Sequence, residues 1–216
     1  MKEVRSKTPN VLGWLEATLN EEEIAYLWNR IENKKSGRDI FGDMEVATNS
    51  KSSYKLEDAG HYFFNEVLAP LCKYYQDQFG NRGTRVATSN KHPLRLMDWW
   101  VNYQNESDYL PIHNHHGVYS FAIWLSIPTE YNEQKRIAEN TNRVQVSNFA
   151  FHYPNILGES TSYVYEMGKK YEGEMVFFPS QLCHAVYPYF ECKKQRISIS
   201  GNIDLDTSKI LHDEGN

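Results

Sequence analysis

The spacing of hydrophobic residues changes near Arg95, and this change restricts the folds open to the chain. Before it, apolar residues recur every three or four positions, as on one face of a helix. After it, Trp99, Val101 and Tyr103 alternate with their neighbours, which is typical of a β-strand. Further strands are predicted over residues 118–127, 144–151, 162–165, 175–178 and 197–203. Short strands separated by turn residues predict an antiparallel jelly roll.

Two helices are predicted in the first third of the chain. Asn20 and Glu23 have the spacing of a capping box, and the apolar positions that follow share one helical face. A second helix is predicted over residues 57–79, with a kink at Pro70. Its buried stripe is expected to comprise Phe63, Val67, Leu71 and Tyr74.

These patterns predict one domain over residues 1–216, mainly β and of the α+β class. A helical part, 1–94, is expected to pack on one face of a β core, 95–205, and residues 206–216 form a tail.

Charge and composition narrow the set of partners. The net charge is −5 with no basic block, which argues against duplex nucleic acid. No stretch has the roughly 18 apolar residues of a membrane span.

The cysteines and the N-terminus favour a reducing, cytoplasmic location. The three cysteines form no CxxC pair, and the N-terminus has no secretory signal. The chain is expected to be a monomer or a homodimer.

A metal site is predicted from histidine spacing. His113 and His115 stand two residues apart, so on an extended segment both side chains face the same way, while His116 faces the other way. His184 follows a strand that breaks at Pro179, where a short turn brings it forward. Each of these histidines also has a plain structural explanation, as a surface or turn-capping residue.

Arg196 opens a strand with one apolar and one polar face. Ile197 and Ile199 belong to the first face, and Ser198 lies on the second with Arg196. A polar face is normally in water, but an arginine twelve residues after His184 is one hairpin away from it. Its planar fork of donors suits a carboxylate, which predicts a site for an acidic co-substrate.

The ordered set of HxH, GEMVFFPSQLCH and RISIS resembles the 2-oxoglutarate- and Fe(II)-dependent oxygenases, nearest to the branch found in marine bacteria and their phages. The resemblance covers about residues 98–204. It implies a double-stranded β-helix, or cupin-like jelly roll, in which His113, His115 and His184 bind the metal. Arg196 would bind the distal carboxylate of 2-oxoglutarate, with Ser198 or Tyr103 as a second donor.

The activity implied by the resemblance is hydroxylation of an unidentified substrate by O2, with decarboxylation of 2-oxoglutarate to succinate. A requirement for ascorbate is left open. If the gene belongs to a phage, the location is the host cytoplasm. Tyr103 has an equally good explanation as an aromatic core residue. Trp99, Trp100 and Trp124 are expected to line or back the pocket, with core packing the main role of at least two of them.

One position departs from the family's usual HxD motif, because His115 stands where the carboxylate is expected. Loss of that negative charge should weaken Fe(II) binding and makes the set similar to three-histidine zinc sites. Asp108, in the preceding loop, is a weaker candidate for the missing carboxylate.

Two other functions stay open at this point. One is a three-histidine cupin-type enzyme, with zinc or another metal, that uses no 2-oxoglutarate. The other is a metal-free jelly roll with a binding or structural role. The primary substrate is not encoded in any motif. Residues 128–172 separate the two histidine motifs and are expected to shape the substrate mouth, with His152 more plausible as a surface residue than as a substrate contact.

Overall fold

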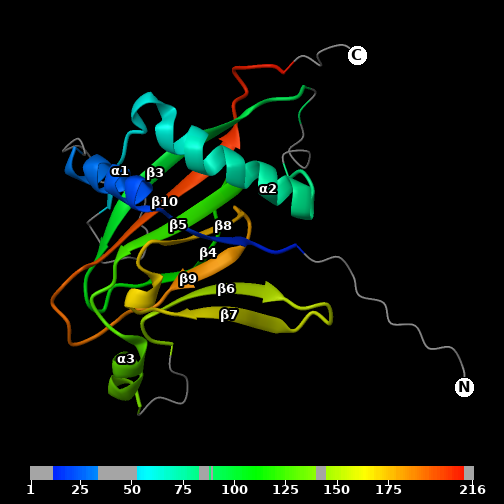
Figure 1. Ribbon diagram of the computed structural model, residues 1–216. Coiled ribbons are helices and arrows are strands. Elements are labelled where there is room, and N and C mark those ends of the chain that lie inside the picture. Colours follow the sequence, from blue (N-terminus) through cyan, green and yellow to red (C-terminus); the bar gives the residue numbers. More distant parts are fainter. Residues whose placement is uncertain (1–11, 34–52, 83–87, 89, 140–144, 212–216) are drawn as a thin grey trace, which may run out of the picture.

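The computed structural model describes residues 12–33, 53–82, 88, 90–139 and 145–211. Its regular elements form two sheets and a layer of helices (Figure 1). The helices and single turns are α1 (Glu21–Glu32), η1 (Ala59–His61), η2 (Phe64–Leu68), α2 (Ala69–Phe79), α3 (Tyr131–Ile137) and η4 (Lys169–Tyr171). The strands are β1 (Leu15–Thr18), β2 (Ser53–Lys55), β3 (Leu94–Gln104), β4 (Leu110–His113), β5 (Tyr119–Ser126), β6 (Asn148–Pro154), β7 (Ser160–Glu166), β8 (Glu174–Pro179), β9 (Cys183–Val186) and β10 (Arg196–Leu205).

The strands form two antiparallel sheets. The large sheet has the order β1-β8-β5-β10-β3-β2, and the small sheet has the order β4-β9-β6-β7. Neighbours such as β10 and β3 are far apart in sequence, which is the crossover pattern of a jelly roll. Figure 1 shows α1 and α2 lying across the outer side of the large sheet, with α3 at one end of the molecule beside the small sheet. The predicted double-stranded β-helix with helices on one face is confirmed.

The large sheet buries both of its faces, and the two faces carry different side chains. Ile123 and Phe177 point toward the helices and are fully buried there. Their neighbours Trp124 and Phe178 point the other way, into the space between the sheets. This alternation follows from the period of two in a strand. It gives the protein a helix-side core and a second, more aromatic core between the sheets.

Two features of the N-terminal sequence hold the helices on the helix-side core: the cap of α1 and the aromatic residue Phe63. The capping box is present, since Glu23 N donates to Asn20 Oδ1 at 2.9 Å and Asn20 N donates to Glu23 Oε2 at 2.8 Å. The ring of Phe63 stacks on Trp99 of β3, with 5.4 Å between ring centroids and 9° between planes. Offset aromatic packing of this kind stabilises a buried interface beyond its area.

Several local expectations are corrected. The predicted second helix is a 3₁₀ turn, a π-turn and α2 in succession, and Pro70 lies in the first turn of α2, where a missing N–H is tolerated. Tyr74 is 57% exposed, so it does not belong to the buried stripe. The part called helical also contributes β1 and β2 to the large sheet.

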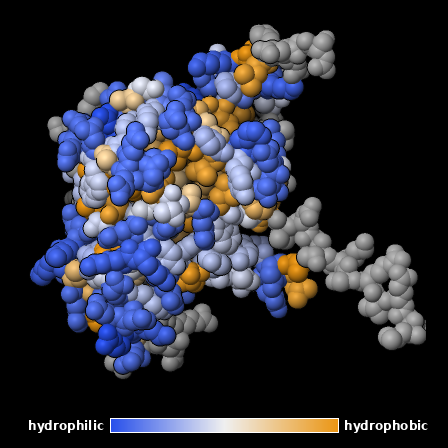
Figure 2. Space-filling model, in the orientation of Figure 1, coloured by the Kyte–Doolittle hydropathy of each residue, from blue (hydrophilic) through white to orange (hydrophobic). Residues whose placement is uncertain are grey.

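The strands predicted over 144–151 and 162–165 are present as β6 and β7, although residue 144 lies outside the described residues and β6 begins only at Asn148. Residues 128–172 therefore contribute half of the small sheet, together with α3 and η4. Strands β4 and β9 were not predicted; each has four residues, and their pairing contains a register shift. At the far end of the β6–β7 hairpin, Ile156 and Leu157 are 71% and 77% exposed and form a small hydrophobic spot on the surface (Figure 2).

Among the described helices, none combines the length and apolar character that crossing a bilayer would demand.

We expect Gly117 to be a position where only glycine fits. Its φ is +97°, and an added Cβ would lie 2.9 Å from the carbonyl oxygen of Ile203. Gly117→Ala should therefore lower the free energy of unfolding by about 2 kcal/mol or more, through backbone strain and displacement of β10.

The matched control is Gly158→Ala at the hairpin tip, where φ is +81° but nothing lies within 4 Å. It should cost about 1 kcal/mol, from backbone strain alone. Urea unfolding of both variants measures the difference, and equal losses would show that the contact with Ile203 is unimportant.

Candidate metal centre

Two of the three predicted histidines face each other across neighbouring strands. His113 ends β4 and His184 lies in β9, and the two are directly paired in the register of these strands. Their ring centroids are 4.3 Å apart. The turn that positions His184 begins at Pro179, whose carbonyl accepts from Leu182 N at 2.8 Å. The predicted strand, break and return around Pro179 is therefore present.

His115 joins this pair from the segment that follows β4. Its backbone N–H donates to the carbonyl of Ser180 at 2.8 Å, which ties it to the end of β8. Its ring centroid lies 5.0 Å from those of both His113 and His184. One ligating nitrogen from each of the three rings falls within 4.8 Å of the others. His116 is exposed and takes no part in the cluster.

Backbone carbonyls orient two of the imidazoles. The Nδ1 atom of His113 lies 2.7 Å from the Pro111 carbonyl, and Nδ1 of His184 lies 3.0 Å from the Leu182 carbonyl. A carbonyl can only accept, so each Nδ1 carries the proton and each Nε2 keeps its lone pair. This is the usual outer contact of a metal-binding histidine.

The cluster is neutral because it is withdrawn from water. Burial lowers the pKa of His184 to about 3 and that of His115 to about 4, and it also lowers the pKa of His113. The charge of each histidine on its neighbours acts in the same direction. Three neutral imidazoles with converging lone pairs fit a divalent ion such as Fe(II) or zinc.

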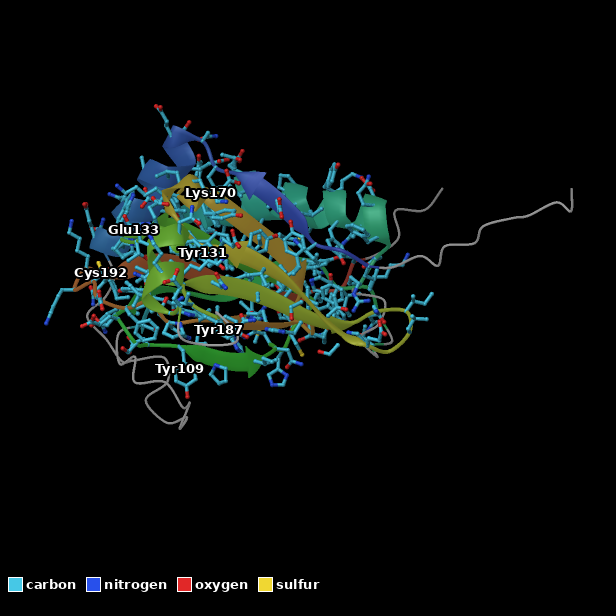
Figure 3. The ribbon with its side chains drawn as sticks, turned by 90° about the horizontal axis from the view of Figure 1, so that it is seen from below. Tyr109, Tyr131, Glu133, Lys170, Tyr187 and Cys192 are labelled. Atoms are coloured by element: carbon cyan, nitrogen blue, oxygen red, sulfur yellow. The ribbon has the colours of Figure 1, made fainter. Side chains whose placement is uncertain are left out.

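The histidines line a cavity of about 310 Å³ between the sheets. Its walls are mostly aromatic and apolar, with contributions from Trp100, Trp124, Phe149, Phe178 and Val186. Trp99 faces the helices instead and is 3% exposed. In Figure 3, Tyr109 projects from the border of the molecule, and this half-exposed residue belongs to the lining at the cavity mouth.

Arg196 lines the same cavity and is the largest of the fully buried side chains. Its guanidinium donates to Gln104 Oε1 at 3.2 Å and to Ser147 Oγ at 2.7 Å, and it lies 5.3 Å from the centroid of the Tyr189 ring. No carboxylate among the described residues forms an ion pair with it, and its Nε has no partner there. Burial lowers the pKa of Arg196 to about 10, so it is charged at neutral pH.

An unpaired buried cation is costly, because the low-dielectric interior does not replace its hydration. The cost is offset if an anion enters the cavity and takes the remaining N–H groups. The donor set therefore fits a ligand with a carboxylate.

The other predicted contacts divide into two groups. Ser198 lines the cavity, two residues along β10 from Arg196. Tyr103 does not, because neighbouring residues of β3 face opposite sides: Asn102 and Gln104 line the cavity, while Tyr103 packs with Tyr54 in the helix-side core. The expectation that Tyr103 contacts the co-substrate is therefore withdrawn.

Asp108 lies in the cavity lining but is not part of the histidine cluster. Its Oδ2 accepts from both N–H groups offered by Asn105. His152 lies outside the cavity lining and interacts with Ser162 and Tyr187. Gln104 and Ser147, which both contact Arg196, were not predicted from the sequence. No sequence signal pointed to them, since the contacts of both with Arg196 span at least 49 residues.

The fold and the cluster define a metal-binding double-stranded β-helix protein. Residues 98–202, about half of the chain, match the family model described as putative 2OG-Fe(II) oxygenase. The chain belongs to the 2-oxoglutarate- and Fe(II)-dependent oxygenases, and its cofactors are Fe(II) and 2-oxoglutarate. No curated protein is significantly similar to it in sequence.

Solved structures show the same fold at low sequence identity. An oxidoreductase of the 2OG-Fe(II) oxygenase family from Burkholderia pseudomallei has a TM-score of 0.51 and 11% identity, over 86% of this chain and 79% of that one. A Trichoplax adhaerens prolyl hydroxylase in complex with a peptide fragment has 0.52 and 10%, over 88% and 82%. HygX from Streptomyces hygroscopicus, with nickel, 2-oxoglutarate and hygromycin B bound, has 0.51 and 10%, over 91% and 84%.

The buried histidines should make the stability of the metal-free protein depend on pH. Their folded pKa values lie below the ordinary histidine value of 6.5, so the unfolded chain binds more protons once the pH falls below that value. The free energy of unfolding should therefore decrease as the pH falls from about 6.5 to about 4.

Urea unfolding of chelator-treated protein at several pH values measures this slope. His184→Gln removes one of the titrating groups, so the free energy of unfolding should fall less steeply with decreasing pH, by the equivalent of up to one bound proton. His152→Gln should have a smaller effect on this slope. A stability that does not change across this window would contradict neutral, buried histidines.

Proposed function

We propose that His113, His115 and His184 bind the Fe(II) and that Arg196 binds the distal carboxylate of 2-oxoglutarate, with Ser198 as a second donor. The observation that carries this proposal is the buried guanidinium, which has no acidic partner in the described part of the chain and lies in the same cavity as three converging imidazoles. The reaction would be hydroxylation of a primary substrate by O2, coupled to decarboxylation of 2-oxoglutarate to succinate.

Backbone carbonyls orient the metal-binding imidazoles, and Arg196 binds the co-substrate. The carbonyls of Pro111 and Leu182 hold two imidazoles with Nε2 toward the cluster. Arg196 neutralises one end of the dicarboxylate, which leaves the keto acid end for the metal. When bound, the iron and 2-oxoglutarate supply the oxidising chemistry. The aromatic walls exclude water, so the charged contacts act in a low dielectric.

The primary substrate would reach the metal from the side of the cavity that opens to solvent. The exposed lining residues there are Tyr109, Pro111 and Asn114. None of them carries a charge, which suits a neutral group at the site of hydroxylation. The similar structures include proteins with a peptide and with hygromycin B bound, and the uncharged side chains that the described part of the chain exposes at this mouth fit a neutral portion of either kind of molecule.

The remaining expectations stay proposals: a single domain with a β core over 95–205, a monomer or homodimer, and a cytoplasmic location.

The test is an anaerobic titration of the Fe(II)-loaded protein with 2-oxoglutarate, followed by the visible charge-transfer band of the iron chelate. Wild type should develop the band. His184→Ala should lose the metal and the band, because two imidazoles remain. Arg196→Met should bind iron but need about 100-fold more 2-oxoglutarate, the usual scale of losing one member of a buried charge pair.

His152→Ala is the control, since this histidine lies outside the cavity and should leave both affinities unchanged. Unchanged affinity for 2-oxoglutarate in Arg196→Met would overturn the assignment of Arg196. Tight zinc binding with no band in the Fe(II)-treated protein would favour the three-histidine enzyme that uses no 2-oxoglutarate.

A further inference from the structure

The guanidinium of Arg196 forms a hydrogen bond with Ser147, a residue that does not line the cavity. Ser147 is fully buried, and its Oγ accepts a 2.7 Å hydrogen bond from one terminal nitrogen of Arg196. The other terminal nitrogen donates to Gln104, which does line the cavity. A guanidinium has five N–H donors. These two contacts leave three of them, including Nε, for a ligand.

Ser147 has an unusual backbone for a serine. Its φ is +49°, in the left-handed region where glycine is favoured and residues with a Cβ are disfavoured. Backbone hydrogen bonds fix it there, since Ser147 N donates to the Pro188 carbonyl at 2.6 Å and Met167 N donates to the Ser147 carbonyl at 3.1 Å. Glycine would adopt this backbone with less strain, so the feature that distinguishes serine from glycine here is its side chain.

The hydroxyl is the only polar group that the Ser147 side chain offers. It lies 3.3 Å from Thr129 Oγ1 as well as 2.7 Å from Arg196. Arginine can only donate, so Ser147 Oγ accepts from it, and the hydroxyl proton is free to point to Thr129. The hydroxyl thus fixes the guanidinium relative to two separate segments, the residue before β6 and the residues after β5.

We propose that Ser147 is a positioning residue for the co-substrate: its strained backbone places a hydroxyl that fixes the Arg196 guanidinium for the distal carboxylate. This inference rests on the proposed function of Arg196. It concerns affinity for the dicarboxylate, and it leaves the metal and the keto acid end of the ligand unaffected. Without the hydroxyl, Arg196 would lose one anchor and bind the carboxylate from a less ordered position.

Two variants separate the hydroxyl from the backbone strain. Ser147→Gly removes the hydroxyl and relieves the left-handed strain, while Ser147→Ala removes the hydroxyl and keeps the strain. Both should raise the Kd for 2-oxoglutarate about tenfold, the scale of one hydrogen bond to a charged group. The rate of succinate formation at saturating 2-oxoglutarate should stay within about twofold, since the hydroxyl does not touch the ligand. The melting temperature should fall in Ser147→Ala and not in Ser147→Gly.

Ser107→Gly is the matched control. Ser107 also has a positive φ, +68°, but it is exposed and has no contact with Arg196. This variant should bind 2-oxoglutarate as wild type does. A second ligand tests the site of action: 2-oxobutyrate has the keto acid but no distal carboxylate, so its affinity should be equal in wild type and in both Ser147 variants.

The outcomes distinguish this inference from the proposed function. If Arg196→Met binds 2-oxoglutarate as wild type does, the proposed function fails and this inference fails with it. If Arg196→Met weakens binding but both Ser147 variants keep wild-type affinity, only the positioning role is overturned. Equal losses for 2-oxoglutarate and 2-oxobutyrate would also overturn it, because they would indicate general damage to the cavity.

Discussion

The central pairing of β10 with β3 and β5 is the constraint on which the structure depends. One face of β10 carries Ile199 and Ile203, which are fully buried against the helices. The other face carries Arg196 and Ser198, which line the cavity. Because neighbouring residues on a strand face opposite sides, a shift by one residue would place the guanidinium in the helix-side core and an isoleucine in the cavity. The hydrophobic core thus fixes the register that positions the site.

Desolvation leaves the histidines of the cavity neutral and Arg196 charged. Burial disfavours charge, and the three histidines respond by staying neutral, which suits metal ligands. Arg196 is buried more deeply than His113 and His115 but keeps its charge, because the ordinary pKa of arginine is so high. One cavity therefore holds neutral lone pairs and a fixed cation, which are the two features that a keto acid dicarboxylate on a metal needs.

The sequence predicts those features that depend on local spacing. Alternation identified the long strands, the pair His113 and His115, and the strand of Arg196, while the strand break at Pro179 pointed to His184. It did not predict β4 and β9, which are short and pair with each other through a register shift. The wrong expectation for Tyr103 has a simple cause: its place in the alternation of β3 was known, but the face of β3 that would be the inner one was not. Gln104 and Ser147 are set by contacts with Arg196 across 92 and 49 residues, which no local pattern encodes.

The exchange of the usual carboxylate for His115 changes the charge of the site. With three neutral histidines, a divalent ion and Arg196 together carry three positive charges, and the two carboxylates of 2-oxoglutarate leave one of them uncompensated. Asp108 is 7% exposed and lines the same cavity, although it is not part of the metal cluster. Its carboxylate brings the sum within the cavity to zero. With the three histidines as the metal ligands, as proposed, the negative charge that they lack would be supplied elsewhere in the lining, which would keep a low-dielectric cavity close to neutral when both cofactors are bound.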